Sequence, residues 1–167
     1  MPNIKSILVN GASGQLGQSF RQLEDSYPQY DFVFAGRTDL DLSDSNKVEA
    51  YFQQHSFDLV INCAAYTAVD KAEEEPEVAN AINHLAVQQI ARIAAKRHAK
   101  FIHVSTDYVF NGEQYRPYIE TDQVAPMSVY GATKLAGEQA VFDEMPVNAL
   151  IIRTSWVYSP FGNNFVK

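Results

Sequence analysis

The segment Ser6-Ile-Leu-Val-Asn-Gly-Ala-Ser-Gly-Gln-Leu-Gly17 places a short apolar run directly before a glycine-rich turn. The apolar run predicts a buried strand, and residues 16–25 predict a helix. A strand, a glycine-rich turn and a helix in this order suit a dinucleotide. The turn lets the backbone approach a pyrophosphate closely, and the helix N-terminus offers unpaired N–H groups. We therefore predict that the cofactor contacts Gly11, Ser13, Gly14 and Gly17.

Strand-like and helix-like segments alternate along the rest of the chain. Apolar runs predict strands at 6–10, 31–35, 58–62, 101–105 and 149–154, and helical periodicity covers 46–55, 76–98 and 128–143. This alternation predicts an α/β fold with a doubly wound parallel sheet of the Rossmann-like type. The polar segment 111–127 predicts a loop at the carboxyl edge of that sheet, where ligands bind in such folds.

A run of acidic residues precedes the longest predicted helix. Pro76 suits the first turn of a helix, and negative charge is favourable near a helix N-terminus. We therefore interpret the carboxylates as helix-start electrostatics rather than as a metal site. They are Glu73, Glu74, Glu75 and Glu77.

Composition narrows the class of protein. The chain has 167 residues, of which 46% are hydrophobic, so we expect one domain over 1–167. Its net charge of −7 and the lack of a basic run argue against nucleic acid or an anionic membrane as a partner. No apolar stretch approaches the ~20 residues of a membrane span. The N-terminal segment has no signal-peptide layout. A single cysteine, Cys63, suits a reducing cytoplasm, and its apolar neighbours favour a packing role over a nucleophilic one.

The end of the second predicted strand bears on the choice of dinucleotide. An acidic residue there would suit the free ribose hydroxyl of NAD, whereas this chain has Arg37, whose guanidinium suits a 2′-phosphate. We therefore expect NADP(H) to be preferred and NAD(H) to be possible. Asp41 and Leu42 could hydrogen-bond and flank the adenine. Arg37 as a solvated loop charge and Asp41 as a plain turn residue remain alternatives.

Tyr130 and Lys134 lie four residues apart on a predicted helix and therefore share one face. A lysine ammonium beside a phenol favours the phenolate, which makes tyrosine a usable acid or base. Thr106 closes the fourth predicted strand, where its hydroxyl could polarise a substrate carbonyl. Together these residues suit carbonyl reduction with a nicotinamide. A strand-end cap, a packed aromatic ring and a surface lysine are the corresponding structural alternatives.

Four longer segments carry a more specific resemblance. They are Asn62-Cys-Ala-Ala-Tyr-Thr-Ala-Val-Asp-Lys-Ala-Glu73, Ser105-Thr-Asp-Tyr-Val-Phe110, Val129-Tyr-Gly-Ala-Thr-Lys-Leu-Ala-Gly-Glu138 and Arg153-Thr-Ser-Trp-Val-Tyr158. With the Gly-x-x-Gly-x-x-Gly spacing, they resemble the dTDP-4-dehydrorhamnose reductases, which are extended short-chain dehydrogenase/reductases.

The resemblance implies an oxidoreductase of dTDP-rhamnose synthesis for cell-surface polysaccharide. It would reduce the 4-keto group of dTDP-4-dehydro-L-rhamnose to give dTDP-L-rhamnose. Thr106, Tyr130 and Lys134 would be catalytic. The dinucleotide would also contact Gln15, Leu16, Ala64, Ala65, Tyr66, Thr67, Tyr130 and Lys134. The sugar would approach Val69, Thr106, Asp107 and Trp156. Trp156 could stack on a ring, or it could be a core residue.

Two local differences refine this expectation. Related 4,6-dehydratases carry a second carboxylate after the Thr-Asp pair, and it serves as the base for elimination of water. This chain has Tyr108 there, so simple reduction is favoured. Some family members bind Mg²⁺ at a dimer contact through a carboxylate two residues past the third glycine. This chain has Ser19 there, so we predict no such metal site, while a homodimer remains possible.

Length is the largest difference from the family. The resemblance implies members well beyond 167 residues, with the remaining part, the C-terminal substrate domain, forming most of the lid over the sugar nucleotide. We therefore expect the chain to bind a dinucleotide but to turn over poorly. Two other functions remain open. One is a non-catalytic NADP-binding regulatory subunit, as in partners of methionine adenosyltransferase, and the other is a reductase or epimerase of another nucleotide sugar.

Overall fold

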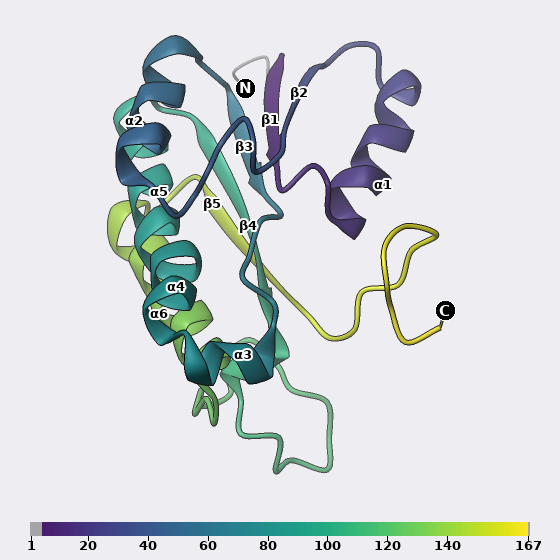
Figure 1. Ribbon diagram of the computed structural model, residues 1–167, viewed down its shortest axis with the longest axis vertical. Coiled ribbons are helices and arrows are strands. Elements are labelled where there is room, and N and C mark those ends of the chain that lie inside the picture. The colour runs from purple at the N-terminus through teal and green to yellow at the C-terminus, as the bar shows by residue number, and fades with distance from the viewer. Residues whose placement is uncertain (1–4, 167) are drawn as a thin grey trace.

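The computed structural model describes residues 5–166 and contains one five-stranded parallel sheet (Figure 1). The strands are β1 (Ser6–Asn10), β2 (Asp31–Ala35), β3 (Leu59–Asn62), β4 (Lys100–Thr106) and β5 (Ala149–Thr154), and their order across the sheet is β2-β1-β3-β4-β5. Residues 1–4 and 167 lie outside the described residues. They include the start of the segment judged to lack a signal-peptide layout and both ends of the predicted 1–167 domain.

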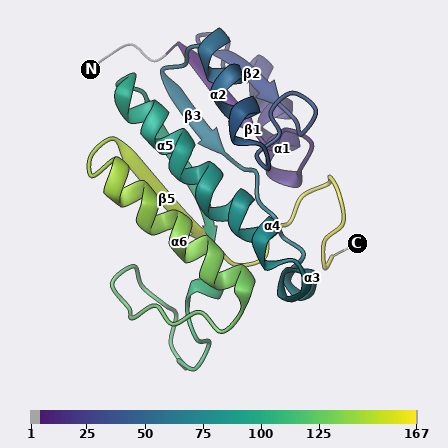
Figure 2. The same ribbon diagram turned by 60° about the vertical axis from the view of Figure 1, so that its left-hand side comes forward.

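Helices cover the two faces of the sheet unequally. Helix α1 (Gln15–Leu23) lies on one face, and α2 (Ser45–Gln54), α5 (Ala86–Lys96) and α6 (Val129–Glu144) lie on the other (Figures 1 and 2). The strand order explains this, because β1 to β2 steps one way across the sheet and every later connection steps the other way. Right-handed crossovers therefore place α1 alone on its face. The predicted doubly wound parallel sheet is confirmed.

Short helices fill the connections. A 3₁₀ turn (Glu24–Ser26) follows α1. Helices α3 (Val69–Glu74) and α4 (Pro76–Asn80) precede a π-helical turn (Ala81–Leu85) that runs into α5, and a 3₁₀ turn (Asp107–Val109) follows β4. None of the helices in residues 5–166 is long and apolar enough to cross a membrane.

Two apolar clusters hold the layers together. The larger one lies between the sheet and α2, α5 and α6, and it includes Leu8, Val48, Phe52, Val60, Ile90, Phe101 and Val141. The smaller one lies between the sheet and α1, and it includes Ile7, Val9, Leu59 and Ile61 with Phe20 against them. Strand β3 is buried along its whole length, as expected for the middle of a sheet covered on both faces.

The predicted elements differ from the structure mainly before α5. The helix predicted over 76–98 is three consecutive pieces, and α3 was not predicted. Pro76 does occupy the first turn of α4, as expected. Only part of the acidic run serves that helix start, however. Glu73 and Glu74 belong to α3, and Glu75 pairs with Lys71 at 2.9 Å and accepts a hydrogen bond from the Tyr66 hydroxyl at 2.8 Å.

Candidate functional site

A cavity of about 700 Å³ lies at the carboxyl ends of the strands. Most of the predicted cofactor contacts line it, from four separate segments of the chain. They are Gly11, Ser13, Gly14, Gln15, Leu16, Arg37, Asp41, Leu42, Ala64, Ala65, Tyr66, Thr67, Tyr130 and Lys134. The predicted residues that do not line it are Gly17, Val69, Thr106, Asp107 and Trp156. The fold therefore gathers the cofactor set and leaves the predicted sugar set beside the cavity.

The glycine-rich turn brings two backbone segments unusually close. Gly11 has a φ of +74°, and a Cβ there would lie 2.6 Å from the backbone nitrogen of Ala64. Gly17 is buried, and a Cβ on it would lie 2.5 Å from the carbonyl oxygen of Gly11. Gly17 therefore permits packing of α1 on the turn instead of contacting a ligand directly. No side chain caps α1 at Gly14, so its first-turn N–H groups remain available to an anion.

Arg37 and Asp41 lie at one end of the cavity. Arg37 is exposed and makes no hydrogen bond or ion pair with any residue of the described chain that would hold its guanidinium away from a ligand. Asp41 accepts hydrogen bonds from the hydroxyl and backbone N–H of Ser43 at 2.6 and 3.1 Å, and these bonds lower the pKa of its carboxyl. Asp41 thus shapes a turn while still lining the cavity, and Leu42 is 8% exposed within the core.

Asn83 on the π-helical turn fixes the segment Ala64–Thr67. Its side-chain oxygen accepts from the Tyr66 backbone N–H at 2.9 Å, and its amide nitrogen donates to the Tyr66 carbonyl at 3.1 Å and to the Thr133 hydroxyl at 3.2 Å. A Cβ on Gly137 would overlap the Asn83 carbonyl oxygen, so the glycine lets α6 pack directly on the turn. The segment lining the cavity is therefore tied to α6 through one buried amide.

Thr106 and Tyr130 meet at the edge of the cavity. Thr106 accepts from the backbone N–H of Tyr108 at 3.2 Å and so caps the 3₁₀ turn, the alternative expected for it. It also hydrogen-bonds the Tyr130 phenol, which lowers the pKa of Tyr130, but burial outweighs this bond and the net pKa of Tyr130 is raised. Ser128 caps α6 by accepting from the Gly131 N–H at 3.1 Å, which orients the turn carrying Tyr130.

Lys134 is 1% exposed, so it is not a surface lysine. Its amine donates to the Val104 carbonyl at 2.7 Å and lies 3.3 Å from His103 Nε2. Burial lowers the pKa of Lys134 to about 8, with Glu138 acting in the opposite direction. Lys134 is not among the groups that shift the pKa of Tyr130 in this ligand-free structure. The predicted lowering of the Tyr130 pKa by Lys134 is therefore wrong for the protein alone, because the amine is turned toward β4.

The predicted sugar contacts lie beyond Tyr130. Asp107 accepts from the Thr106 hydroxyl at 3.2 Å, and Val69 packs against the cluster that contains Tyr130. Trp156 is 67% exposed and contacts Phe165 with ring centroids 5.6 Å apart, which excludes the alternative of a core tryptophan. Its indole is therefore free to cover a ligand from the side of the C-terminal segment.

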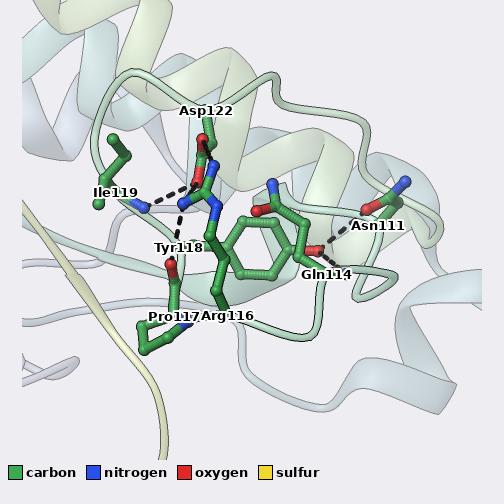
Figure 3. Close-up of polar contacts among 7 residues, drawn as sticks. All are labelled: Asn111, Gln114, Arg116, Pro117, Tyr118, Ile119 and Asp122. Atoms are coloured by element: carbon green, nitrogen blue, oxygen red, sulfur yellow. Dashed lines mark hydrogen bonds and ion pairs between the residues drawn. The ribbon is translucent and has the colours of Figure 1, made fainter.

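The predicted loop 111–127 is confirmed and is internally ordered (Figure 3). Arg116 makes a forked contact with Asp122 at 2.7 and 3.1 Å, and Asp122 also accepts from the Ile119 backbone N–H at 2.9 Å. The Tyr118 ring stacks on Phe110 with centroids 4.2 Å apart, and its hydroxyl donates to Asn111 at 3.0 Å. These contacts hold the loop at the carboxyl edge of the sheet (Figure 1).

The C-terminal segment closes one side of the cavity. Gln15 accepts from Ser159 at 3.0 Å and from Asn164 at 3.1 Å, which ties this segment to the start of α1 (Figure 1). Val157 and Gly162 consequently line the cavity, although neither was predicted to do so. Sequence patterns could not have found these contacts because nearly the whole chain separates the two segments.

Several other lining residues were missed. Ser105 is 3% exposed and its hydroxyl has no partner in the described chain. It was not predicted as a site residue, whereas the neighbouring Thr106 was. Cys63 also lines the cavity, and burial raises the pKa of its thiol to about 12, in keeping with the predicted packing role. The strand-end positions of Ser105 and Cys63 were the available signal. Within residues 5–166 no group of three or more His, Cys, Asp or Glu side chains could hold a metal ion.

Comparison with known proteins finds relatives that are named as reductases of dTDP sugars. A dTDP-4-dehydrorhamnose reductase from Escherichia coli is 44% identical over 164 residues, covering 97% of this chain and 54% of the relative. A dTDP-4-keto-6-deoxy-D-glucose reductase from Streptomyces niveus is 38% identical over 160 residues, covering 96% of this chain and 55% of the relative.

Among solved structures, a dTDP-4-dehydrorhamnose reductase from Bacillus anthracis in complex with NADP superimposes with a TM-score of 0.91 at 37% identity. The superimposed region covers 98% of this chain and 57% of the B. anthracis chain. The chain thus spans about half the length of the relatives it matches. The model of the RmlD substrate binding domain matches residues 5–167, and the chain belongs to this family.

Proposed function

We propose that this chain carries the dinucleotide site and the proton-donating groups of an NADPH-dependent reductase of a 4-keto sugar nucleotide. The observation that carries the proposal is the position of Tyr130 and Lys134, which line the same cavity as the uncapped N-terminus of α1. One end of the cavity therefore suits a pyrophosphate, and the other presents a hydroxyl acid. We treat residues 1–167 as one dinucleotide-binding domain with catalytic residues.

The residues lining the cavity fit a dinucleotide. Gly11 allows close backbone approach, Arg37 offers an unpaired guanidinium, and Ser105 offers an unpartnered hydroxyl. The nicotinamide, when bound, supplies the hydride for carbonyl reduction. Tyr130 gives its phenolic proton to the carbonyl oxygen that becomes the alcohol. Its raised pKa keeps that proton in place at neutral pH. Thr106 lowers the pKa of Tyr130 through a side-chain hydrogen bond, and we propose that its hydroxyl helps to bind the same carbonyl oxygen.

The preferred substrate is dTDP-4-dehydro-L-rhamnose, reduced to dTDP-L-rhamnose, with NADPH favoured over NADH. The names of the E. coli and B. anthracis relatives support this choice. Tyr108 stands where an eliminating enzyme needs a second carboxylate, and its ring packs edge-on against Tyr130 with centroids 5.5 Å apart. A reductase of another dTDP-keto sugar is the second candidate, favoured by the S. niveus relative. We place the activity in the cytoplasm, and a homodimer stays a prediction.

The predicted sugar contacts do not line the cavity that gathers the predicted cofactor contacts, so we propose strong dinucleotide binding and weak turnover. The test titrates NADPH and NADH separately into the wild-type chain and into Arg37→Ala, following fluorescence. NADPH should bind more tightly to the wild type, and the preference should shrink in the variant. Equal affinities for NADPH and NADH in both the wild type and the variant would contradict the proposed role of Arg37.

Turnover is tested by NADPH consumption with dTDP-4-dehydrorhamnose, using this chain and a longer version from the same gene. The longer version should turn over faster. Tyr130→Phe should slow its hydride transfer by about 10²-fold or more, as expected for loss of a general acid. Tight NADPH binding with no hydride transfer in the longer version would instead favour the regulatory-subunit alternative. Ordinary rates from the 167-residue chain would contradict weak turnover.

A further inference from the structure

A chain of three buried polar side chains runs from the cavity wall into the protein. Asn62 and His103 are completely buried and Lys134 is 1% exposed. The Asn62 amide nitrogen lies 3.0 Å from His103 Nδ1, and His103 Nε2 lies 3.3 Å from the Lys134 amine. They come from the end of β3, the middle of β4 and α6. Buried side chains of this kind satisfy one another, so their hydrogen bonds must be consistent in direction.

The direction is set at the Ala64 end of the chain. The Ala64 backbone N–H can only donate, and it lies 3.2 Å from the Asn62 side-chain oxygen. The Asn62 amide nitrogen therefore faces His103 and donates to Nδ1. Burial and the neighbouring Lys134 lower the pKa of His103 well below its usual value, so the ring is neutral and has one proton. With Nδ1 accepting, that proton is on Nε2 and points at Lys134.

This arrangement favours one form of the lysine. A neutral amine has a lone pair that accepts from His103 Nε2–H, and it still donates to the Val104 carbonyl at 2.7 Å. An ammonium has no lone pair and would meet the imidazole N–H as a second donor. Relieving that conflict requires the other imidazole tautomer and a rotated Asn62 amide, which breaks the bond from Ala64 N–H.

We propose that His103, oriented by Asn62, is a positioning residue that favours the neutral amine of Lys134 over its ammonium in the ligand-free protein. Charging Lys134 then requires the Asn62 amide to turn, and this couples the lysine proton to the Ala64 backbone that lines the cavity. The catalytic meaning of this coupling rests on the proposed function. The hydrogen-bond direction stands on the geometry of the protein alone.

Other groups also shift the pKa of Lys134, and their effects must be distinguished from the effect of His103. Glu138 on the same helix favours the ammonium and is itself bound by Arg153 through three contacts of 2.7 to 3.2 Å. Cys63 also favours it, and burial opposes it. Tyr130 shares the cavity wall. A test must therefore change the His103 donor while leaving these neighbours in place.

The test is a pH titration of the free protein labelled with ¹³C at the lysine ε-carbon, with Lys134 assigned from a Lys134→Arg variant. In the wild type, Lys134 should titrate at or below pH 8, whereas ordinary lysines titrate near ~10.4. His103→Gln keeps a hydrogen-bonding group of similar size but can present an oxygen to an ammonium. It should raise the Lys134 midpoint by about one pH unit, a tenfold change in proton affinity.

Two further variants sharpen the result. His84→Gln is the matched control and should leave the Lys134 midpoint unchanged, because His84 on the π-helical turn hydrogen-bonds only to Asn80 among residues 5–166. Asn62→Ala removes the amide that donates to His103 Nδ1, so the ring can carry its proton on Nδ1 and leave Nε2 to accept from the ammonium. It should also raise the midpoint, and it adds no charge. If His103→Gln does not fold, Asn62→Ala still decides the question.

A wild-type midpoint near pH 10, or an unchanged midpoint in the variant that folds, would overturn the proposal. Since the titration uses no ligand, its outcome is independent of whether the chain is a reductase. Failure of the proposed function would appear separately, as absent NADPH binding in the fluorescence titration.

Discussion

Ser105 carries a buried hydroxyl without a partner in the described chain, beside the cavity. A buried hydroxyl without a hydrogen bond costs about 1–3 kcal/mol, and a ligand that supplies the bond regains it. We predict that Ser105→Ala leaves the free energy of unfolding equal or raises it by about 1 kcal/mol. NADPH should bind about fivefold more weakly, the equivalent of about 1 kcal/mol. Urea unfolding and fluorescence titration measure the two effects.

Ser128→Ala is the matched control for this variant. It removes the hydroxyl that caps α6, so its free energy of unfolding should fall by about 1 kcal/mol. Lower stability of Ser105→Ala with unchanged NADPH affinity would mean that Ser105 supports the strand and contacts no ligand.

Lys134 gives stability a distinct pH dependence. Its folded-state pKa is lowered to about 8, against 10.5 ordinarily. Below pH 8 both states hold the proton, and the folded state bears the cost of a buried charge. Between the folded-state and the ordinary pKa, the unfolded chain binds a proton that the folded protein lacks, so the free energy of unfolding rises with pH. Above the upper value both states are neutral and the rise ends.

We predict that this rise, of order 3 kcal/mol, is absent in Lys134→Met. Urea unfolding at several pH values from 7.5 to 10.5 should show the wild type gaining on the variant. The comparison cancels other groups that titrate in this range, such as the tyrosines. Lys71→Met is the control, because Lys71 is exposed and its pKa is raised by Glu75, so it should not reproduce the effect. A constant difference between Lys134→Met and wild type would contradict the lowered pKa.

A site residue could be predicted where its place in the site follows from its immediate neighbours in the sequence. Gly11 and Arg37 follow strand ends directly, so the pattern that predicts the strand also predicts the position at the cavity. His103 and Asn62 read as apolar-run residues, and only the three-dimensional sheet brings their side chains to Lys134. The contacts of Lys134 with Val104 and His103 were not predicted, for the same reason. Spacing along a helix shows a shared face but not the partner on the neighbouring strand.

At the scale of elements, the π-helical turn Ala81–Leu85 deserves its own prediction, since it directs Asn83 at Tyr66 and Thr133. Turns of this type are frequent at functional sites. Asn83→Ala removes three hydrogen bonds and leaves the Tyr66 backbone groups unsatisfied, so the free energy of unfolding should fall by about 1–3 kcal/mol. NADPH affinity should also fall, because the segment Ala64–Thr67 loses its tie to α6.

Asn80→Ala is the matched control, since Asn80 makes one side-chain contact, to His84, on the outer part of the same segment. It should change the unfolding free energy by no more than about 0.5 kcal/mol. Equal effects of the two asparagine variants on NADPH binding would show that the whole segment is loosened, and the specific role of Asn83 would be lost.

Strands were predictable from sequence because their apolar runs are short and bounded. Residues 6–10, 31–35 and 149–154 agree with β1, β2 and β5. The region 69–85 was not predictable in the same way. The apolar period continues from Pro76 through the π-helical turn, so one helix over 76–98 was expected where α4, the turn and α5 follow one another, and α3 was not expected. Contacts with α6, which include the packing of Gly137 on Asn83, determine those breaks.

At the scale of the whole molecule, the two faces of the sheet are covered unequally. Parallel sheets normally have both faces covered. Alternate residues of β5 point away from α6, and Leu150 and Ile152 are 54% and 42% exposed there. Helix α1 packs beside β1, far from this part of the sheet (Figures 1 and 2). Adjacent apolar side chains of this kind form a surface that attracts other apolar molecules.

We predict that the double variant Leu150→Thr with Ile152→Thr binds less of a naphthalene sulfonate dye than the wild type and sediments more uniformly at high concentration. Threonine keeps strand propensity, and exposed substitutions change the free energy of unfolding by only about 0.5 kcal/mol each. Ile151→Thr is the control, since Ile151 packs against the larger core cluster. Ile151→Thr should lower the free energy of unfolding by at least about 1 kcal/mol and should not lower dye binding to the folded state. Unchanged dye binding in the double variant would place the exposed apolar surface elsewhere, with Trp156 and Phe165 as the next residues to replace.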